Sequence, residues 1–140
     1  PRRISANWTF WPSTAGLHPQ PLGVVGVIGA WNYPLQLTLS PAANALAAGN
    51  RVLLKPSEHA PRTAALLQRV IAENFAPEVF SVVTGDAEVS AAFSALPFDH
   101  LLFTGSTRVG RKVMQAAAEK LTPVTLELGG KSPAIIQAEP

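Results

Sequence analysis

The chain has 140 residues, of which 47% are hydrophobic and only 14% are charged, with a formal net charge of +2. This composition excludes a disordered tail, and scattered basic residues form no stripe that would indicate nucleic-acid binding. The absence of cysteine excludes disulfides, thiolate metal sites and a cysteine nucleophile on this chain, and the three histidines lack metal-ligand spacing, so we expect no metal site.

From the two ends of the chain we expect a segment of a longer protein, and removal of the initiator methionine by processing is the alternative. The sequence starts and ends with proline, and it carries no initiator methionine and no apolar signal core. Its apolar runs are as short as strands and are interrupted by glycine, proline or lysine, so no transmembrane span is expected. We therefore expect a cytoplasmic location.

The first predicted unit is an irregular arm over residues 1–21. It contains Trp8, Phe10 and Trp11 among prolines and shows no helical or strand period. Exposed aromatic residues of this kind indicate docking against a partner or another domain, and a small local core is the alternative.

From residue 22 onward, predicted strands and helices alternate. Strands are predicted at residues 23–29, 51–55, 79–84, 100–104 and 124–128, with one more at 134–136, and helices at 35–48, 61–75, 87–96 and 108–121. Pro41 is expected to start or kink the first helix, and Leu66, Val70 and Leu121 fall on apolar helix sides by their spacing. The alternation predicts an α/β fold, a Rossmann-like parallel sheet with helices on both faces.

Unusual residues follow five of the predicted strands. They are Trp31-Asn32, Lys55-Pro56-Ser57-Glu58, Gly85-Asp86, Gly105-Ser106-Thr107 and Glu127-Leu128-Gly129-Gly130. Parallel sheets bind ligands at the carboxyl ends of their strands, which lie at one edge. We therefore expect these five groups to form one site.

Glu127 is a lone carboxylate in an apolar run that begins at Val124. Apolar surroundings disfavour the charged form of a carboxyl group, which suits a general base or acid. The glycines at 129 and 130 allow a sharp turn and close approach of another group. The alternative is a carboxylate on the polar face of an alternating strand, beside Thr125.

The segment from Gly105 to Gly110 opens a helix directly after a strand. Free backbone N–H groups at such a helix start suit a phosphate, and glycine permits close approach. The alternative is an ordinary cap by a serine or threonine. A P-loop is excluded because Arg111 stands where the lysine is required and Val113 does not supply the hydroxyl.

Three further polar side chains at the predicted strand ends suit a nucleotide and a reacting carbonyl. Lys55 and Glu58 can donate to and accept from the vicinal hydroxyls of a ribose, or they form a surface ion pair that contributes little. The Asn32 amide can donate to a developing oxyanion, or it can bond its own turn.

Four segments together resemble the aldehyde dehydrogenase superfamily, in their order and spacing, from about residue 20 to the end. They are Ala30-Trp31-Asn32-Tyr33-Pro34, Lys55-Pro56-Ser57-Glu58, Phe103-Thr104-Gly105-Ser106-Thr107-Arg108-Val109-Gly110 and Glu127-Leu128-Gly129-Gly130-Lys131. Tyr33 and the run from Leu126 to Pro133 resemble the class 3-like branch, and coniferyl aldehyde dehydrogenases within it. Ala30 departs from the proline that relatives often carry.

The resemblance implies NAD(P)-dependent oxidation of an aldehyde to a carboxylic acid. In that family a cysteine thiolate attacks the carbonyl carbon, hydride passes to the nicotinamide, and water hydrolyses the thioester. Carried onto this sequence, Asn32 would donate to the oxyanion and Glu127 would be the general base that activates the water.

The resemblance also implies residues that bind the cofactor. They are Lys55 and Glu58 for the adenosine ribose, Gly105 and Ser106 for the pyrophosphate, Gly85 and Val109 for the adenine side, and Gly110 in the same glycine-containing segment. A glutamate at position 58 favours NAD over NADP, because a carboxylate suits a free ribose hydroxyl better than a 2′-phosphate. Some relatives use both cofactors.

One departure limits what this chain does alone. The family's nucleophilic cysteine, and the later glutamate that holds the nicotinamide ribose, lie beyond the glycine pair, and this chain contains no cysteine. We therefore predict that residues 22–140 form a partial NAD(P)-binding Rossmann-like domain that is inactive alone. The parent is expected to be a homo-oligomer, a dimer, that acts on an aromatic aldehyde and has no nucleic-acid or membrane partner. The alternative is a non-catalytic nucleotide-binding or interaction module derived from the same fold.

Overall fold

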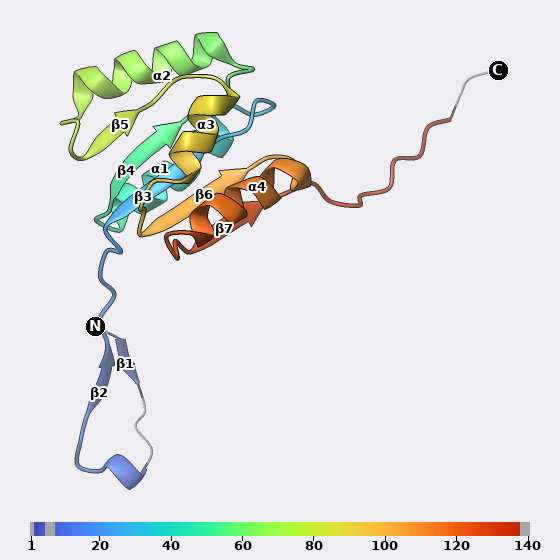
Figure 1. The fold of residues 1–140 in the computed structure, drawn as a ribbon. Helices are drawn as coiled ribbons and strands as arrows, with labels where there is room; N and C mark the ends of the chain where they lie inside the picture. The colour runs from blue at the N-terminus through green and yellow to red at the C-terminus, as the bar shows by residue number, and fades with distance from the viewer. Residues whose placement is uncertain (1, 5–7, 138–140) are drawn as a thin grey trace.

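A five-stranded parallel sheet forms the centre of the chain (Figure 1). The computed structural model describes residues 2–4 and 8–137, so the parts of the predicted arm at residues 1 and 5–7 and the end of the predicted domain at 138–140 lie outside it. The strand order is β5 (Phe80–Val82), β4 (Arg51–Lys55), β3 (Val24–Ile28), β6 (His100–Thr104) and β7 (Val124–Glu127). All four neighbouring pairs are parallel, which confirms the predicted sheet.

Four helices pack on the two faces of this sheet. They are α1 (Gln36–Ala47), α2 (Pro61–Asn74), α3 (Ala87–Ser94) and α4 (Thr107–Ala118). One core joins α1 and α2 to β3, β4 and β5, and the other joins α3 and α4 to β3, β6 and β7. Helices on both faces are thereby confirmed.

The side chains of β3 point alternately to the two faces of the sheet, and they contribute to a separate core on each face. Val25 and Val27 lie in the core under α1 and α2, whereas Ile28 lies in the core under α3 and α4. A strand buried on both faces reads as a continuous apolar run. Gly26 has a packing role as well, because a Cβ there would lie 2.7 Å from the ring of Phe98.

Two polar side chains, which the sequence did not mark, hold the amino end of β3 in place. Asn50 Oδ1 accepts hydrogen bonds from the backbone N–H groups of Leu22 at 2.6 Å and Gly23 at 3.0 Å, while its Nδ2 donates to the carbonyl of Ala45 at 3.0 Å. Asp99 Oδ2 accepts from the N–H of Val24 at 2.7 Å. These bonds satisfy backbone groups that the sheet leaves unpaired.

Several helix details differ from the predictions. Pro41, which was expected to start or kink the first helix, lies inside α1 and does not start it. In α2 the buried stripe contains Leu67 and Ile71, so that Leu66 and Val70, one position away from them, are exposed. Leu121 follows the end of α4 in a left-handed conformation, with a φ of 55°, and is 89% exposed.

The predicted irregular arm contains regular structure. Strand β1 (Arg2–Ile4) pairs in antiparallel fashion with β2 (Ala15–Leu17), and a short 3₁₀ helix (Trp8–Phe10) lies between them. Figure 1 shows this hairpin extending away from the central sheet. Trp8 and Trp11 are both more than four-fifths exposed, so the described residues give them no local core.

The strand expected at residues 134–136 is wrong. No regular element lies between Glu127 and residue 137, and Ile135 and Ile136 are both at least nine-tenths exposed. A β-branched run becomes a strand only when a neighbouring strand pairs with its backbone groups. Among the described residues, none pairs with this segment.

Candidate cofactor and active site

The strand register brings the predicted site residues to one edge of the sheet. Ile28 is level with Lys55 on one side and with Phe103 on the other, and Thr104 is level with Glu127. Because all strands are parallel, their carboxyl ends share this edge. The five groups of residues expected there do follow the ends of β3, β4, β5, β6 and β7.

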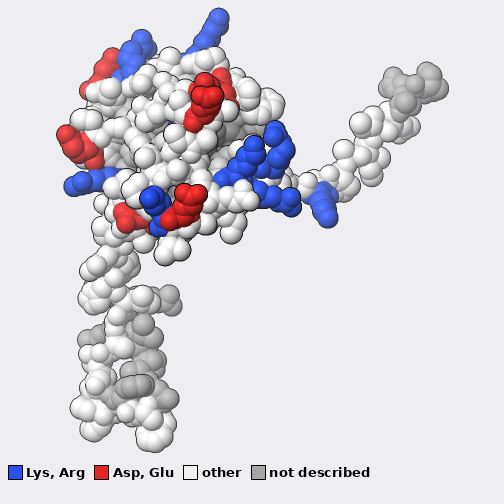
Figure 2. Space-filling model, in the orientation of Figure 1, with Lys and Arg blue, Asp and Glu red and all other residues white. Residues whose placement is uncertain are grey.

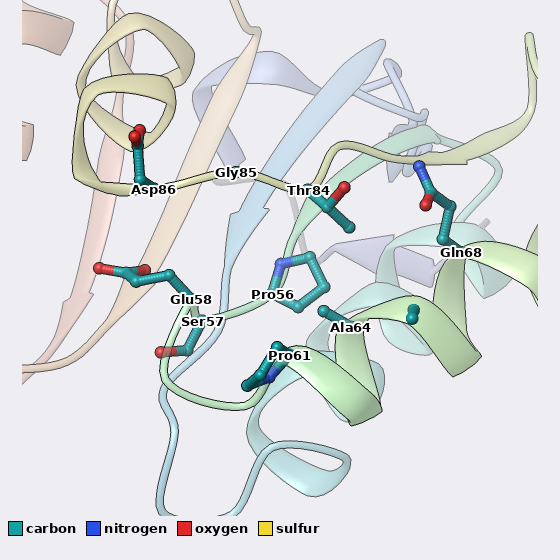
Figure 3. Close-up of a pocket in the computed structure, with 10 residues that line it drawn as sticks. Pro56, Ser57, Glu58, Pro61, Ala64, Gln68, Thr84, Gly85 and Asp86 are labelled. Carbon is teal, nitrogen blue, oxygen red and sulfur yellow. The ribbon is translucent and has the colours of Figure 1, made fainter.

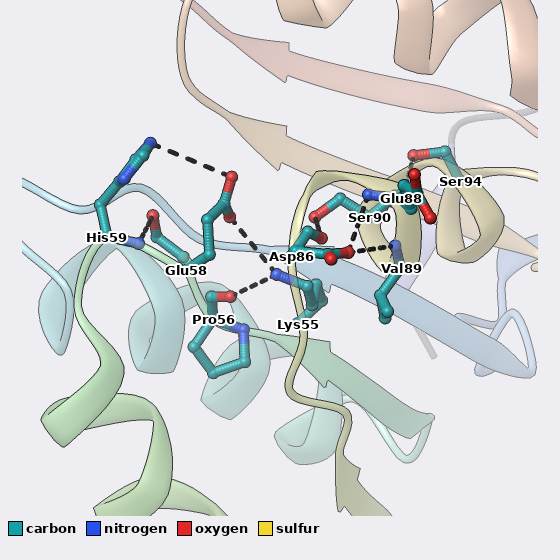
Figure 4. A network of polar contacts seen from close by, with 10 residues as sticks. Lys55, Pro56, Glu58, His59, Asp86, Glu88, Val89, Ser90 and Ser94 are labelled. Atoms are coloured by element: carbon teal, nitrogen blue, oxygen red, sulfur yellow. Dashed lines mark hydrogen bonds and ion pairs between the residues drawn. The ribbon is translucent and has the colours of Figure 1, made fainter.

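Lys55 is buried at the end of β4, with a side chain that is 0% exposed. Its Nζ donates to the carbonyl of Pro56 at 2.8 Å and lies 3.5 Å from Oε2 of Glu58, which is 34% exposed (Figure 4). A buried ammonium requires such partners, because removing it from water is costly. The alternative of a solvated surface ion pair is therefore wrong for Lys55.

A pocket of about 340 Å³ opens beside this ion pair (Figure 3). Its lining residues come from the loop after β4, the first turns of α2 and the loop after β5: Pro56, Ser57, Glu58, Pro61, Ala64, Ala65, Gln68, Thr84, Gly85 and Asp86. Gly85 has a φ of +157°, and a Cβ there would lie 2.5 Å from a methyl group of Val89. The lining of the pocket therefore combines apolar side chains with several polar ones, as ligand sites commonly do.

The segment after β6 is tied both to α4 and to β7. Ser106 caps α4, because its Oγ accepts from the N–H of Val109 at 3.3 Å, so the ordinary-cap interpretation of this serine is confirmed. The N–H of Gly105 donates to the carbonyl of Glu127 at 3.0 Å. Gly110 is buried, and a Cβ there would lie 2.7 Å from the side chain of Leu128, so this glycine lets α4 approach the end of β7 closely.

Basic side chains gather over the start of α4 in the space-filling view (Figure 2). Arg108, Arg111 and Lys112 are all exposed on this helix. Neither its first nor its second turn contains an acidic residue to pair with them. The basic residues are scattered along the sequence, but the fold places these three together near the Gly105-Ser106 loop.

Asn32 and Glu127 are both exposed. Asn32 lies in the turn between β3 and α1, and its side chain makes no hydrogen bond within the described residues, so the turn does not satisfy its amide. Glu127 ends β7 with an exposed side chain. The apolar surroundings expected for this carboxylate are therefore not supplied by residues 2–4 and 8–137.

The glycines that follow Glu127 are not crowded by the part of the chain that is described. A Cβ at Gly129 would meet nothing within 4 Å, and a Cβ at Gly130 would only touch Ser132 Oγ at 4.0 Å. The close approach expected at these glycines is thus not made within the described residues.

Two polar residues at the site were not assigned a role from the sequence. Asp86 Oδ1 accepts from the N–H groups of Glu88 at 3.0 Å and Val89 at 3.1 Å, which caps α3, and the position of an aspartate just before a helix could have indicated this. Thr38 is fully buried beside Gly29, and its hydroxyl has no hydrogen-bond partner among the described residues. No sequence pattern marks that threonine.

Two other kinds of feature are absent from residues 2–4 and 8–137. Within these residues, no group of three or more histidine, aspartate or glutamate side chains is placed to hold a metal ion. No helix in this part of the chain has the length and apolar character needed to cross a membrane.

The chain is similar to known proteins over nearly its whole length. The model of the aldehyde dehydrogenase family matches residues 4–139. A probable coniferyl aldehyde dehydrogenase of Pseudomonas aeruginosa is 58% identical over 97% of the chain, and aldehyde dehydrogenase family 3 member A2 of Rattus norvegicus is 49% identical over 99% of it. The chain spans 29% and 28% of these two relatives, which is less than a third of either.

Solved structures agree with this similarity. A substrate-bound aldehyde dehydrogenase, AldH of Staphylococcus aureus, matches 94% of the chain and 29% of its own length with a TM-score of 0.91 and 42% identity. An aldehyde dehydrogenase of Mycobacterium tuberculosis complexed with NAD+ matches 80% of the chain and 24% of its own length with a TM-score of 0.73 and 50% identity. Because the family model matches residues 4–139 and these solved structures share the fold, the chain belongs to the aldehyde dehydrogenase family.

Proposed function

We propose that this chain is the cofactor-binding part of an NAD(P)-dependent aldehyde dehydrogenase that oxidises an aldehyde to a carboxylic acid. The observation that carries the proposal is the pocket beside the Lys55–Glu58 pair, at the carboxyl edge of a parallel sheet. NAD+ bound in the similar Mycobacterium tuberculosis enzyme supports a nicotinamide cofactor. When bound, such a cofactor accepts the hydride that leaves the substrate carbon.

The donor and acceptor groups of the pocket fit the adenosine end of NAD. Lys55 Nζ has hydrogens left to donate after its bond to Pro56, and Glu58 has a partly exposed carboxylate to accept ribose hydroxyl protons. Gly85 lines the pocket, and it is proposed to border the adenine together with Val109 of α4, which is not among the residues that line this pocket.

The start of α4 fits the pyrophosphate. The N–H groups of a helix start favour an anion, and Arg108, Arg111 and Lys112 add positive charge nearby. Gly105 and Ser106 are proposed to meet the phosphates, with Ser106 acting through its backbone because its hydroxyl caps the helix. Gly110 acts by letting α4 pack closely on Leu128.

Asn32 and Glu127 are proposed to act on the substrate side. The Asn32 side-chain amide makes no hydrogen bond to the described residues. It is therefore available to donate to the oxyanion that forms when a thiolate attacks the aldehyde. Glu127 is exposed at the same edge and can accept a proton from the water that hydrolyses the acyl group. The thiolate must come from residues outside this chain, which contains no cysteine.

The finer proposals rest on the relatives. A coniferyl aldehyde-like aromatic aldehyde is proposed as substrate because of the 58% identity to the probable coniferyl aldehyde dehydrogenase. NAD is proposed as the main cofactor, with NADP as the second. A cytoplasmic homodimer is proposed for the complete protein.

Turnover assays on two lengths of the protein test this function. The full-length protein that contains this chain is expected to reduce NAD when coniferyl aldehyde is added, and the 140-residue chain alone is expected to reduce none, because it has no cysteine. Absorbance of the reduced cofactor is the readout. A full-length protein that binds NAD but oxidises no aldehyde, or a chain that turns over alone, would contradict the proposal.

A further inference from the structure

Glu58 is contacted by a second side chain besides Lys55, and the proposed function leaves that contact unused. His59 Nε2 lies 4.0 Å from Oε1 of Glu58, while Lys55 Nζ lies 3.5 Å from the other oxygen, Oε2. Figure 4 shows the carboxylate between the two basic groups. The His59 side chain is 70% exposed, so it reaches Glu58 from the solvent side, opposite the buried lysine.

The loop that carries His59 has a defined conformation. The N–H of His59 donates to Ser57 Oγ at 3.2 Å, and the N–H of Ala60 donates to the Ser57 carbonyl at 3.2 Å. Ser57 is itself buried. The imidazole is therefore presented beside the pocket by a hydrogen-bonded turn, and Pro61 begins α2 directly after it.

We infer that His59 sets how well this site accepts a ribose that carries a 2′-phosphate, an inference that rests on the proposed cofactor site. A free ribose hydroxyl donates to Glu58, which favours NAD, whereas the negative charges of a 2′-phosphate are repelled by the same carboxylate. With neutral His59, the formal charges of Lys55 and Glu58 cancel. Protonation of His59 makes the net charge of the three groups +1 and draws Glu58 Oε1 away from the ribose.

The other charged residues on the elements around the pocket do not provide this function. Asp86 lines the pocket, but it carries a negative charge, and its Oδ1 is already bonded to two N–H groups of α3. Glu88 in α3 is also acidic, and Lys55 keeps its bond to the Pro56 carbonyl. Arg62 in the first turn of α2 is exposed and has no ion pair within the described residues. Besides Lys55, His59 is thus the basic side chain that contacts Glu58 among the described residues, and an imidazole can be either neutral or positively charged.

Calorimetric titration of NAD and NADP into the full-length protein tests this inference, at about pH 6, where histidine side chains in general become charged. The readout is the ratio of the NADP Kd to the NAD Kd. We expect His59→Arg, which carries a fixed charge, to lower this ratio by roughly fivefold, and His59→Gln to raise it by roughly threefold. His18→Gln, which changes an exposed histidine of the hairpin, is the matched control and should leave the ratio unchanged.

The outcomes separate the two proposals. If NAD binds but either His59 variant leaves the ratio at the parent value, the role of His59 is overturned while the cofactor site stands. If the His18→Gln control shifts the ratio as much as His59→Gln does, the effect is not local to Glu58 and the inference is likewise overturned. If neither cofactor binds to the full-length protein, the proposed function itself fails, and the role of His59 fails with it.

Discussion

The substitution Glu127→Gln is expected to lower kcat of the full-length protein by about 10²- to 10⁴-fold. A glutamine amide has nearly the shape of the carboxylate but cannot accept a proton from water. Glu127 is exposed at the end of β7, so the change buries no new group and should not unfold the protein. Steady-state turnover of coniferyl aldehyde with NAD is the first measurement.

The transient phase shows which step Glu127 serves. Because hydride transfer precedes hydrolysis, a variant that lacks only the base should form about one equivalent of reduced cofactor per site and then stop. Glu119→Gln, which changes an exposed glutamate at the end of α4, is the matched control and should turn over normally. A Glu127→Gln variant with normal steady-state turnover would show that another group activates the water.

The substitution Lys55→Met is expected to weaken NAD binding by about 100-fold, since a hydrogen bond from a charged donor contributes about 1.5–3 kcal/mol. Methionine fills most of the volume of the buried lysine without leaving a buried charge. It also removes the only cation that holds Glu58 Oε2 in the described residues. The loss should therefore appear in the Kd measured by titration, with little change in Tm.

Lys120→Met is the matched control for this change. Lys120 is exposed after the end of α4 and has no ion pair in the described part of the chain. It should bind NAD as the parent does. If Lys55→Met binds NAD equally well, the buried ammonium serves only the fold, and the ribose assignment of Lys55 and Glu58 is wrong.

The sequence predicted the sheet well because its strands are buried on both faces. Short, largely apolar runs such as Val24–Ile28 and Arg51–Lys55, each followed by glycine or proline, leave few other structures for those residues. Parallel pairing then follows from the helices between the strands, and parallel pairing places the strand ends at one edge. The meeting of these strand ends at one edge could thus be predicted before any contact was known.

Contacts between distant elements could not be predicted in the same way. The complete burial of Lys55 is a result of tertiary packing at the end of β4, and a lysine followed by a turn motif in the sequence could equally be exposed. The burial of Gly110 against Leu128 depends on the crossing of α4 over β7. The hydroxyl of Thr38 is buried and has no hydrogen-bond partner in the described part of the chain, for which we have no physical explanation.

Two segments differ from the predictions because pairing, and not propensity, decides their state. Strand β2 has the sequence Ala-Gly-Leu, which has little strand propensity, yet its backbone pairs with β1. Residues 134–136 include two isoleucines and have high propensity, yet no described strand pairs with them. Both cases show that short strands are defined by their partners.

Hydrogen exchange of the full-length protein, with and without NAD, tests most directly whether the strand edge is the cofactor site. We predict that NAD slows exchange in three segments of the chain. Their backbone N–H groups lie at the pocket or at the start of α4, and the segments are Lys55–His59, Thr84–Asp86 and Gly105–Val109. The hairpin strand Ala15–Leu17 should show no change. If NAD is bound and the exchange rates of all three segments stay unchanged, the strand edge is not the cofactor site.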